Sequence, residues 1–525
     1  MSTSVVWFRK CLRLDDNPAL TQACDDQSTD SILPIFILDP EIVGRNFEKF
    51  GTNRLIFLLE SLRDLDHSLK PQADNHLLIF MGSPSKVIHS LFQSLGDQCK
   101  NLHSDYCSEP HGRESTSKIL GENNEPVRIP CVFHPAAHTL LDIEKTLLSD
   151  GFKNPKSMRD ISSIFSKIFP ADDSGFFQVP APLPAPQVIK SFPKYFDHKS
   201  FQATYQIEIL TVSTLTAKFS ELGLLNPSNQ SNYFKGGETE ALSRLDRKVS
   251  TQKDFVNTFR KPKSSSTNLS SNSLEPSTTG LSPYLSVGSL SVRRLWKEVE
   301  KANRSGSHTS PPESLHGQLL FREMFYLLSR SVDHWDRDES NEMCKNIEWG
   351  IYDQKKMEAW DQGMTGFPPI AAMVGQLVST GWVHRLGRHA VSCFLTRGQL
   401  WQHWKHGRDV FERKLLDSDW ALNNANWLWL SGVAPFSMPY FRLYNPCPDG
   451  KSSLNVDAKT ATFIKYWVPE LKNFPVKYIY EPQLAPQQMQ RDADCIIGQD
   501  YPLPIVNRKD AAKENLAKFK SSLSR

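Results

Sequence analysis

The sequence predicts two domains of different fold class, an N-terminal α/β domain with a doubly wound parallel sheet and a large all-α domain after it. In the N-terminal part, short apolar runs alternate with amphipathic helical patterns, as in sheets whose parallel strands are joined by helices. In the C-terminal part, apolar residues recur at helical spacing, and segment 381–430 alone holds six tryptophans. A Pro-rich stretch at 178–187 lies between the two patterns and favours extended backbone.

The predicted α/β domain contains three buried strands and the helices that follow them. Strands are expected over 4–8, 31–40 and 76–82, and helices over 53–69 and 83–95. Ligands of such sheets bind beyond the carboxyl ends of the strands. The sequence has no GxGxxG, so the dinucleotide-binding fingerprint is absent. We divide the chain into a sheet domain at 1–130, an interdomain linker at 131–215, a helical domain at 216–505 and a short tail at 506–525.

Composition and charge limit the classes of function. The 61 Lys and Arg residues against 58 Asp and Glu give a net charge of +3, so any affinity for DNA must come from a local patch. The nine cysteines are scattered without a CxxC pair, which indicates a reducing compartment and neither a disulfide framework nor a metal site. No apolar run is long enough to cross a membrane, and the start of the chain lacks a signal-peptide core. We expect a monomer in the nucleus or cytoplasm.

Segment 381–430 combines charged, polar and aromatic residues in a helical pattern. Over 382–396 the apolar residues share one arc of a predicted helix, while His384, Arg385, Arg388 and His389 share the opposite arc. The pattern alone fits two interpretations, because a cationic arc is also typical of a solvated face and tryptophans at helical spacing are typical of an ordinary core. Two acids and two amides follow, and they favour a polar site inside an aromatic core: Asp417, Asp419, Asn423 and Asn424.

Two earlier segments carry groups that suit a bound ligand. Segment 273–291 places small hydroxyl residues before a predicted helix, where they offer hydroxyls and free N–H groups to an anion. The same residue types are equally suited to an ordinary helix N-cap. Segment 317–328 has the pattern of a buried helix, with Gln318 and Arg322 on one face.

Three long stretches carry a resemblance to a known family. They are SLEPSTTGLSPYL at 273–285, RHAVSCFLTRGQLW at 388–401 and LLDSDWALNNANWLWL at 415–430. The chain resembles the cryptochrome and photolyase family over about residues 4–505, and within it the branch of the (6-4) photolyases and animal cryptochromes. The resemblance implies a photolyase-type α/β domain, which in this family can hold an antenna pigment, a folate or a deazaflavin, and a helical domain that binds FAD.

The resemblance also implies which residues hold the FAD. Arg388 and Asp417 match the buried ion pair beside the isoalloxazine, Asp419 is expected at the pyrimidine edge, and Asn423 is expected opposite N5. An asparagine there can hydrogen-bond a reduced, protonated N5, as in photolyases. The complete expected cofactor site is Thr278, Thr279, Leu281, Ser282, Gln318, Arg322, Arg385, Arg388, Asp417, Asp419, Asn423 and Asn426.

Four tryptophans match the electron-transfer chain of the family. Excited flavin would oxidise Trp427 first, and the hole would pass outward through Trp404 and Trp349 to Trp401. Because Trp401 and Trp404 are three residues apart, we expect one helix to present both.

The sequence departs from the photolyase pattern at the lesion pocket. Arg385 stands where the (6-4) photolyases have the histidine that donates a proton to the lesion, and arginine cannot shuttle a proton. His389 matches the second histidine of that pair, and Trp429 remains as a wall of the pocket. Phe321 replaces a tryptophan and offers a smaller stacking face. Two further departures lie on a predicted helix face, Ala371 for aspartate and Gly375 for arginine.

These observations support two hypotheses for the function. The first is a photolyase-type enzyme that flips a damaged base of double-stranded DNA into a pocket above reduced flavin and repairs it with light. The second is a cryptochrome photoreceptor whose light-reduced flavin alters the surface offered to a signalling partner. The first is favoured by Asn423 and by four cations expected near the DNA face: Arg260, Lys261, Lys263 and Lys405.

Overall fold

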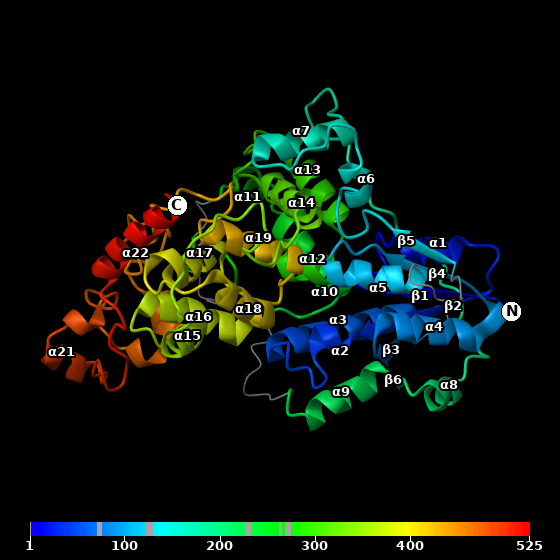
Figure 1. Ribbon diagram of the computed structural model, residues 1–525, viewed down its shortest axis with the longest axis horizontal. Coiled ribbons are helices and arrows are strands. Elements are labelled where there is room, and N and C mark those ends of the chain that lie inside the picture. Colours follow the sequence, from blue (N-terminus) through cyan, green and yellow to red (C-terminus); the bar gives the residue numbers. More distant parts are fainter. Residues whose placement is uncertain are drawn as a thin grey trace.

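The computed structural model describes residues 2–70, 76–121, 130–225, 233–261, 265–267 and 275–524. An α/β domain lies at one end of the molecule, and the C-terminal helices lie at the other end (Figure 1). The helices that bear the predicted site lie between these two ends. The predicted combination of a doubly wound sheet domain and an all-α domain is confirmed.

The α/β domain is built on one six-stranded sheet with the order β5-β4-β1-β2-β3-β6. All neighbours are parallel except β6, which pairs with β3 in the antiparallel direction. Residues 131–215, predicted as mostly linker, supply β5 and β6. These strands are too short to show a periodic pattern of apolar residues in the sequence. The strands are β1 Thr3–Trp7, β2 Ser31–Leu38, β3 Leu78–Met81, β4 Cys99–Asp105, β5 Cys131–His134 and β6 Glu208–Leu210.

Helices cover both faces of this sheet, which is why its strands are apolar without alternation. Val6 of β1 packs into a core shared with α1, α3 and α9, whereas Val5 and Trp7 pack into a second core shared with α4, α5 and α8. These helices and their neighbours are α1 Pro18–Asp25, α2 Pro40–Val43, α3 Thr52–Leu69, α4 Pro84–Leu95, α5 Pro110–Leu120, α6 Ile143–Leu147, α7 Met158–Ile168, α8 His198–Tyr205 and α9 Val212–Glu221.

The helical domain surrounds one large core, in which Trp296, Trp335, Trp360, Trp404 and Trp427 are fully buried. Its helices are α10 Glu238–Leu245, α11 Lys253–Thr258, α12 Ser282–Val287, α13 Val292–Asn303, α14 Leu315–Ser331, α15 Gln354–Asp361, α16 Pro368–Thr380, α17 Arg385–Cys393, α18 Trp404–Lys414, α19 Trp420–Leu430, α20 Thr462–Trp467, α21 Gln487–Asp492 and α22 Arg508–Leu523.

Buried polar groups fix the two domains against each other. The Arg13 guanidinium, 1% exposed, donates to the carbonyls of Asp16 and Ala137 at 2.8 Å and to that of Gly288 at 2.9 Å. Glu238 of α10 accepts the N–H groups of Leu14 and Asp15 at 2.7 and 2.8 Å. Charged groups with several hydrogen bonds at a buried contact hold a defined relative position.

The helix expected over 382–396 is shorter than predicted. His384 is the N-cap, with its Nδ1 accepting the Leu386 N–H at 3.1 Å, and α17 gives way at Phe394 to a π-helical turn that ends at Gly398. Trp401 then takes a left-handed backbone with φ of 55°, and α18 starts only at Trp404. The prediction that one helix presents Trp401 and Trp404 is therefore wrong.

Two further features of the helical domain were not anticipated. Segment 506–525, predicted as a tail, forms α22, whose Phe519 is fully buried beside the rings of Trp349 and Trp401 at 6.2 and 6.4 Å. At Gly375 of α16, a Cβ atom would lie 3.0 Å from the carbonyl oxygen of Trp467 in α20. The close packing of α16 on α20 thus occupies the space that a larger side chain at this position would need.

Candidate flavin site

A cavity of about 320 Å³, here called the main cavity, lies among α12, α14, α17 and α19. These helices present residues far apart in the sequence to one space. The main cavity gathers every residue of the expected cofactor site except Asp419, namely Thr278, Thr279, Leu281, Ser282, Gln318, Arg322, Arg385, Arg388, Asp417, Asn423 and Asn426.

An ion pair crosses one wall of the main cavity. The Arg388 Nη2 donates to Asp417 Oδ2 at 2.7 Å, and Arg388 Nε donates to the Val383 carbonyl at 3.0 Å. The other carboxylate oxygen, Asp417 Oδ1, is buried and has no hydrogen-bond partner among the described residues. A buried carboxylate oxygen without a donor is costly, so this wall fits a ligand that brings an N–H or O–H group to it, as FAD does.

The amide of Asn423 is held in one orientation by α18. Its Nδ2 donates to the Arg408 carbonyl at 3.1 Å and to Glu412 Oε2 at 3.0 Å. Neither Arg408 nor Glu412 lines the main cavity, whereas Asn423 does, so its amide oxygen is the group left to accept a hydrogen bond from a ligand there. Such an acceptor suits the protonated N5 of a reduced flavin.

The hydroxyl-rich loop before α12 forms the opposite part of the wall. Gly280 has φ of 63°, and a Cβ atom there would lie 2.9 Å from a guanidinium nitrogen of Arg244. The Arg244 Nη1 is also 3.4 Å from the Thr279 carbonyl. Glycine therefore allows the loop to close over the buried Arg244 guanidinium, and Thr278, Thr279 and Ser282 line the main cavity.

The structure places Asp419 away from the main cavity, and its expected role needs correction. Asp419 is the N-cap of α19, where Oδ1 accepts the Leu422 N–H at 3.1 Å. Its Oδ2 accepts the Tyr326 hydroxyl at 2.7 Å and lies 3.3 Å from Lys10 Nζ of the sheet domain. Burial opposes ionisation, but the Lys10 ammonium holds the pKa of this carboxyl below its usual value. An N-cap carboxylate must turn back toward its own helix, which directs Asp419 to the domain interface.

The four predicted electron-transfer tryptophans form two groups. Trp427 lines the main cavity, and Trp404 lies on the adjacent helix α18; both are 0% exposed. Trp349 and Trp401 are in direct contact, with ring centroids 5.0 Å apart. The centroid of the His403 ring lies 5.6 Å from that of Trp404 and 6.1 Å from that of Trp349. His403 therefore contacts one tryptophan of each group.

At another end of the main cavity, six side chains form what we call the cationic chamber. Phe321 and Trp429 stack at 5.8 Å, and the Lys261 ammonium lies 4.5 and 4.6 Å from their ring centroids. The Arg385 guanidinium is 5.1 Å from the Trp429 ring. The chamber consists of Lys261, Phe321, Arg385, His389, Trp429 and Tyr444.

Protonation of His389 is unfavourable in this chamber. Its Nδ1 and the Tyr444 hydroxyl share a hydrogen bond of 2.9 Å. Burial, followed by the charges of Arg385 and Lys261, lowers the pKa of His389 well below its usual value. Burial likewise lowers the pKa of Arg385 to about 10, which leaves it charged at neutral pH. The chamber therefore holds a permanent cation, Arg385, beside a neutral His389.

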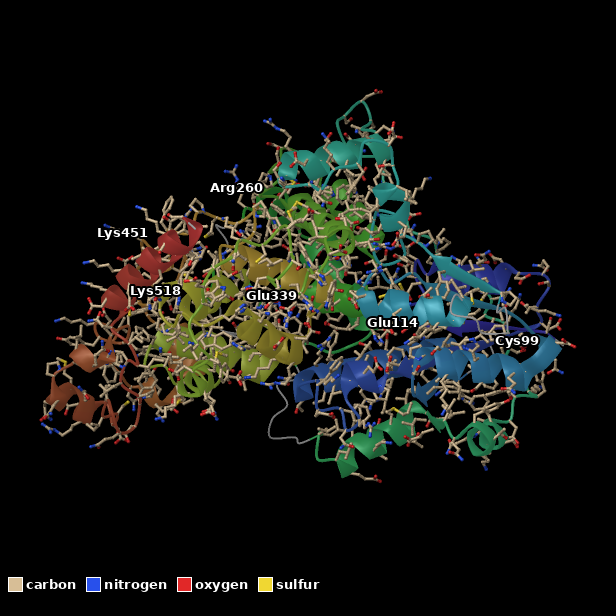
Figure 2. The ribbon with its side chains drawn as sticks, viewed as in Figure 1. Cys99, Glu114, Arg260, Glu339, Lys451 and Lys518 are labelled. Atoms are coloured by element: carbon tan, nitrogen blue, oxygen red, sulfur yellow. The ribbon has the colours of Figure 1, made fainter. Side chains whose placement is uncertain are left out.

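The sequence did not reveal Lys261 and Tyr444 as members of this site. Lys261 was predicted on the DNA face, but its ammonium turns into the main cavity. Arg260 beside it is exposed (Figure 2). Lys405 is already paired with Asp338 and Glu339, at 3.3 and 3.4 Å. Lys263 lies outside the described residues.

Comparison with known proteins agrees with this geometry. Residues 4–187 match the family described as DNA photolyase, and residues 314–521 match the FAD binding domain of DNA photolyase. The (6-4)DNA photolyase of Arabidopsis thaliana is 38% identical over 98% of this chain and 87% of its own length. Cryptochrome-1 of Sylvia borin is 36% identical over 98% of this chain and 78% of its own length. The chain belongs to the DNA photolyase and cryptochrome family.

Solved structures of this family share the fold. A bacterial class III photolyase from Agrobacterium tumefaciens superposes with a TM-score of 0.78 at 24% identity, covering 100% of this chain and 98% of its own. A Synechocystis cryptochrome gives the same TM-score at 23% identity, covering 98% of this chain and 99% of its own. The arrangement of sheet domain and helical domain is thus that of both photolyases and cryptochromes.

A second cavity of about 200 Å³ lies between the two domains of this family member. It is beyond the carboxyl ends of β1, β2 and β4, where Trp7, Leu38 and Cys107 reach its wall. Such an edge is where doubly wound sheets bind ligands.

Among the described residues, no cluster of three or more His, Cys, Asp or Glu is placed to hold a metal ion. No described helix is both long and apolar enough to span a membrane.

We expect Asp417→Asn to lower both stability and flavin content. The change leaves Arg388 without a counter-charge in a mostly buried wall, and loss of one partner of such a pair costs about 3 kcal/mol. The free energy of unfolding in urea and the FAD-to-protein absorbance ratio measure the two effects. Asp361→Asn is the matched control, because Asp361 pairs with Arg413 and Lys414 near the surface and such pairs contribute at most about 1 kcal/mol. Equal losses in both variants would contradict the role of Asp417.

Proposed function

We propose that this chain binds FAD in the main cavity and uses blue light to repair UV-damaged DNA of the (6-4) type. One observation carries the proposal: the acceptor oxygen of Asn423 and the indole of Trp427 reach the same cavity from one helix, α19. Bound FAD would supply the light absorption and the electron chemistry. Asn423 would favour its reduced, N5-protonated form, and Trp427 would be the nearest electron donor.

The burial of the tryptophans favours transfer outward along the chain. The indole N–H groups of Trp427 and Trp404 are buried without a partner among the described residues. A proton leaves a side chain only where an acceptor is in hydrogen-bond reach. An oxidised Trp427 or Trp404 thus keeps its proton and regains its electron from the next tryptophan, which directs the hole to Trp349 and Trp401.

The aromatic walls of the cationic chamber support a nucleic-acid substrate. Bases that leave a duplex are held by stacking on aromatic side chains, and Trp429 with Phe321 offers such a surface. The Arabidopsis relative named (6-4)DNA photolyase supports the same substrate class. For the second cavity we propose an antenna pigment, a folate or a deazaflavin, because its walls combine apolar residues with Arg9, Asp39 and Glu109.

A cryptochrome photoreceptor is the second candidate. It is favoured by one specific observation, the charged Arg385 beside a neutral His389, because this arrangement lacks the proton donor of repair. In that case the light-reduced flavin would act on a partner protein instead of DNA.

Binding to damaged DNA distinguishes the two candidates. We expect the flavin-loaded protein to bind a duplex with a (6-4) lesion more tightly than the matched undamaged duplex, and both affinities to fall with salt as counterions are released. Trp429→Ala removes a stacking face worth about 1–3 kcal/mol, so it should weaken only lesion binding. Trp467→Ala in α20 is the control for loss of an indole elsewhere. Equal affinity for both duplexes would favour the photoreceptor.

A further inference from the structure

The cationic chamber holds two positive charges without a negative one. Within the described part of the chain, no carboxylate lies in ion-pair distance of Lys261 or Arg385, although the neighbouring cations of the main cavity have such partners. Arg388 pairs with Asp417 at 2.7 Å, and Arg322 pairs with Glu323 at 3.3 Å. The described groups that face Lys261 and Arg385 include aromatic rings, the imidazoles of His384 and His389, and the Tyr444 hydroxyl.

Two buried cations are unfavourable without a neighbouring anion. Burial lowers the pKa of the Lys261 ammonium well below its usual value, and the charge of Arg385 adds to this effect. Contacts with the faces of Trp429 and Phe321 compensate for only part of the lost hydration, because a cation–π contact contributes about 0.5–2 kcal/mol. Two half-buried cations without a counter-charge therefore favour binding of an anion.

The geometry of the cations restricts the anion. A guanidinium offers a planar pair of donors that matches phosphate oxygens, and an ammonium adds a compact point charge. Two positive charges suit a phosphate group, which carries one negative charge as a diester in a DNA strand and about −1.5 to −2 as a monoester at neutral pH. A neutral nucleobase alone would leave both charges unpaired. The rings can instead hold the base of a molecule whose phosphate reaches the cations.

We propose that the cationic chamber binds the phosphate group of a nucleotide, with the Arg385 guanidinium and the Lys261 ammonium as its ligands. This deepens the proposed function, on which it rests for the presence of nucleotides at the main cavity. The phosphate can belong to a free nucleotide or to a DNA strand. In either case Arg385 acts as an anion ligand at the position where repair enzymes of the family carry a proton donor.

Calorimetric titration of the flavin-loaded, full-length protein tests this proposal. Thymidine 5′-monophosphate is expected to bind, and uncharged thymidine to bind at least about tenfold more weakly. Arg385→Gln and Lys261→Gln should each weaken binding of the monophosphate about ten- to a hundredfold, since each removes a charge-assisted contact. Arg385→Lys keeps the charge and should retain most of the affinity. Lys477→Gln is the control, because Lys477 also lies over a ring, that of Tyr478 at 5.0 Å, outside the site.

The outcomes separate this inference from the function on which it rests. An oligonucleotide without terminal phosphates distinguishes the two sources of the phosphate. Its binding should depend on Arg385 if the chamber takes a phosphate of the DNA strand, and should not depend on Arg385 if the chamber takes only free nucleotides. Equal affinities for thymidine and its monophosphate, or unchanged affinity in Arg385→Gln, overturn the proposal. Absorbance of the same samples reports bound FAD. Samples without flavin contradict the proposed function, whereas an Arg385-dependent titration in them still supports the phosphate site.

Discussion

Replacement of Trp427 by phenylalanine is expected to abolish light-driven reduction of the bound flavin while FAD remains in place. Trp427 is the one member of the tryptophan chain that lines the main cavity, and its ring packs against Gly407 and Phe411. Phenylalanine keeps an aromatic ring in this space but is much harder to oxidise. The measurement is the loss of oxidised-flavin absorbance under anaerobic blue light with an external thiol as the final donor.

Trp360→Phe provides the matched control for this prediction. The Trp360 ring is only 6.3 Å from that of Trp427 and is equally buried, but Trp360 is not part of the predicted chain. Its variant should therefore photoreduce at nearly the unaltered rate. Photoreduction that survives in Trp427→Phe, or that fails equally in Trp360→Phe, would show that electrons reach the cavity by another route.

Arg385→His is expected to raise the rate of (6-4) lesion repair about 100-fold, the lower end of what a positioned general acid contributes. Arg385 keeps its proton at neutral pH, because a pKa lowered to about 10 is still far above it. The change has a second effect on His389. Burial and then the Arg385 charge lower the pKa of His389, so exchange of the permanent guanidinium charge for an imidazole that is only partly protonated raises this pKa and increases the protonated share of His389. Repair is measured at saturating lesion oligonucleotide, so that weaker phosphate binding does not affect the rate, by chromatography after illumination of the photoreduced protein.

Arg385→Gln separates the two contributions to this gain. Glutamine removes the charge without supplying a proton, so it should show only the smaller gain that comes through His389. The dependence on pH has a defined sign: repair by Arg385→His should fall as pH rises and the introduced imidazole loses its proton. A gain in Arg385→Gln equal to that in Arg385→His would show that the charge, rather than the missing proton donor, limits repair.

The sequence predicted the fold class and most of the residues at the main cavity, for clear physical reasons. Buried strands joined by amphipathic helices have a strong pattern, whereas Arg388 and Asp417 were predicted at the cofactor site through the family resemblance of the stretches 388–401 and 415–430. The periodicity of apolar residues did not predict β5 and β6, because strands of four and three residues are too short to show it.

The errors at the site arise where backbone geometry overrides helical spacing. Trp401 cannot share a helix with Trp404, because the π-helical turn and a left-handed residue intervene. Asp419 turns away from the main cavity, because it caps its own helix. Lys261 was predicted as one of four cations near the DNA face, and only the folded chain shows that its ammonium lies against the rings of Phe321 and Trp429. Such long-range placements leave no local signal in a single sequence.

Flavin content and blue-light reduction of the unaltered, full-length protein test the central claim most directly. The account predicts that the purified protein carries a single FAD per chain, and that anaerobic blue light with a thiol donor converts this flavin to its reduced form. A protein that carries no FAD, or whose bound FAD stays oxidised under prolonged illumination, would contradict it.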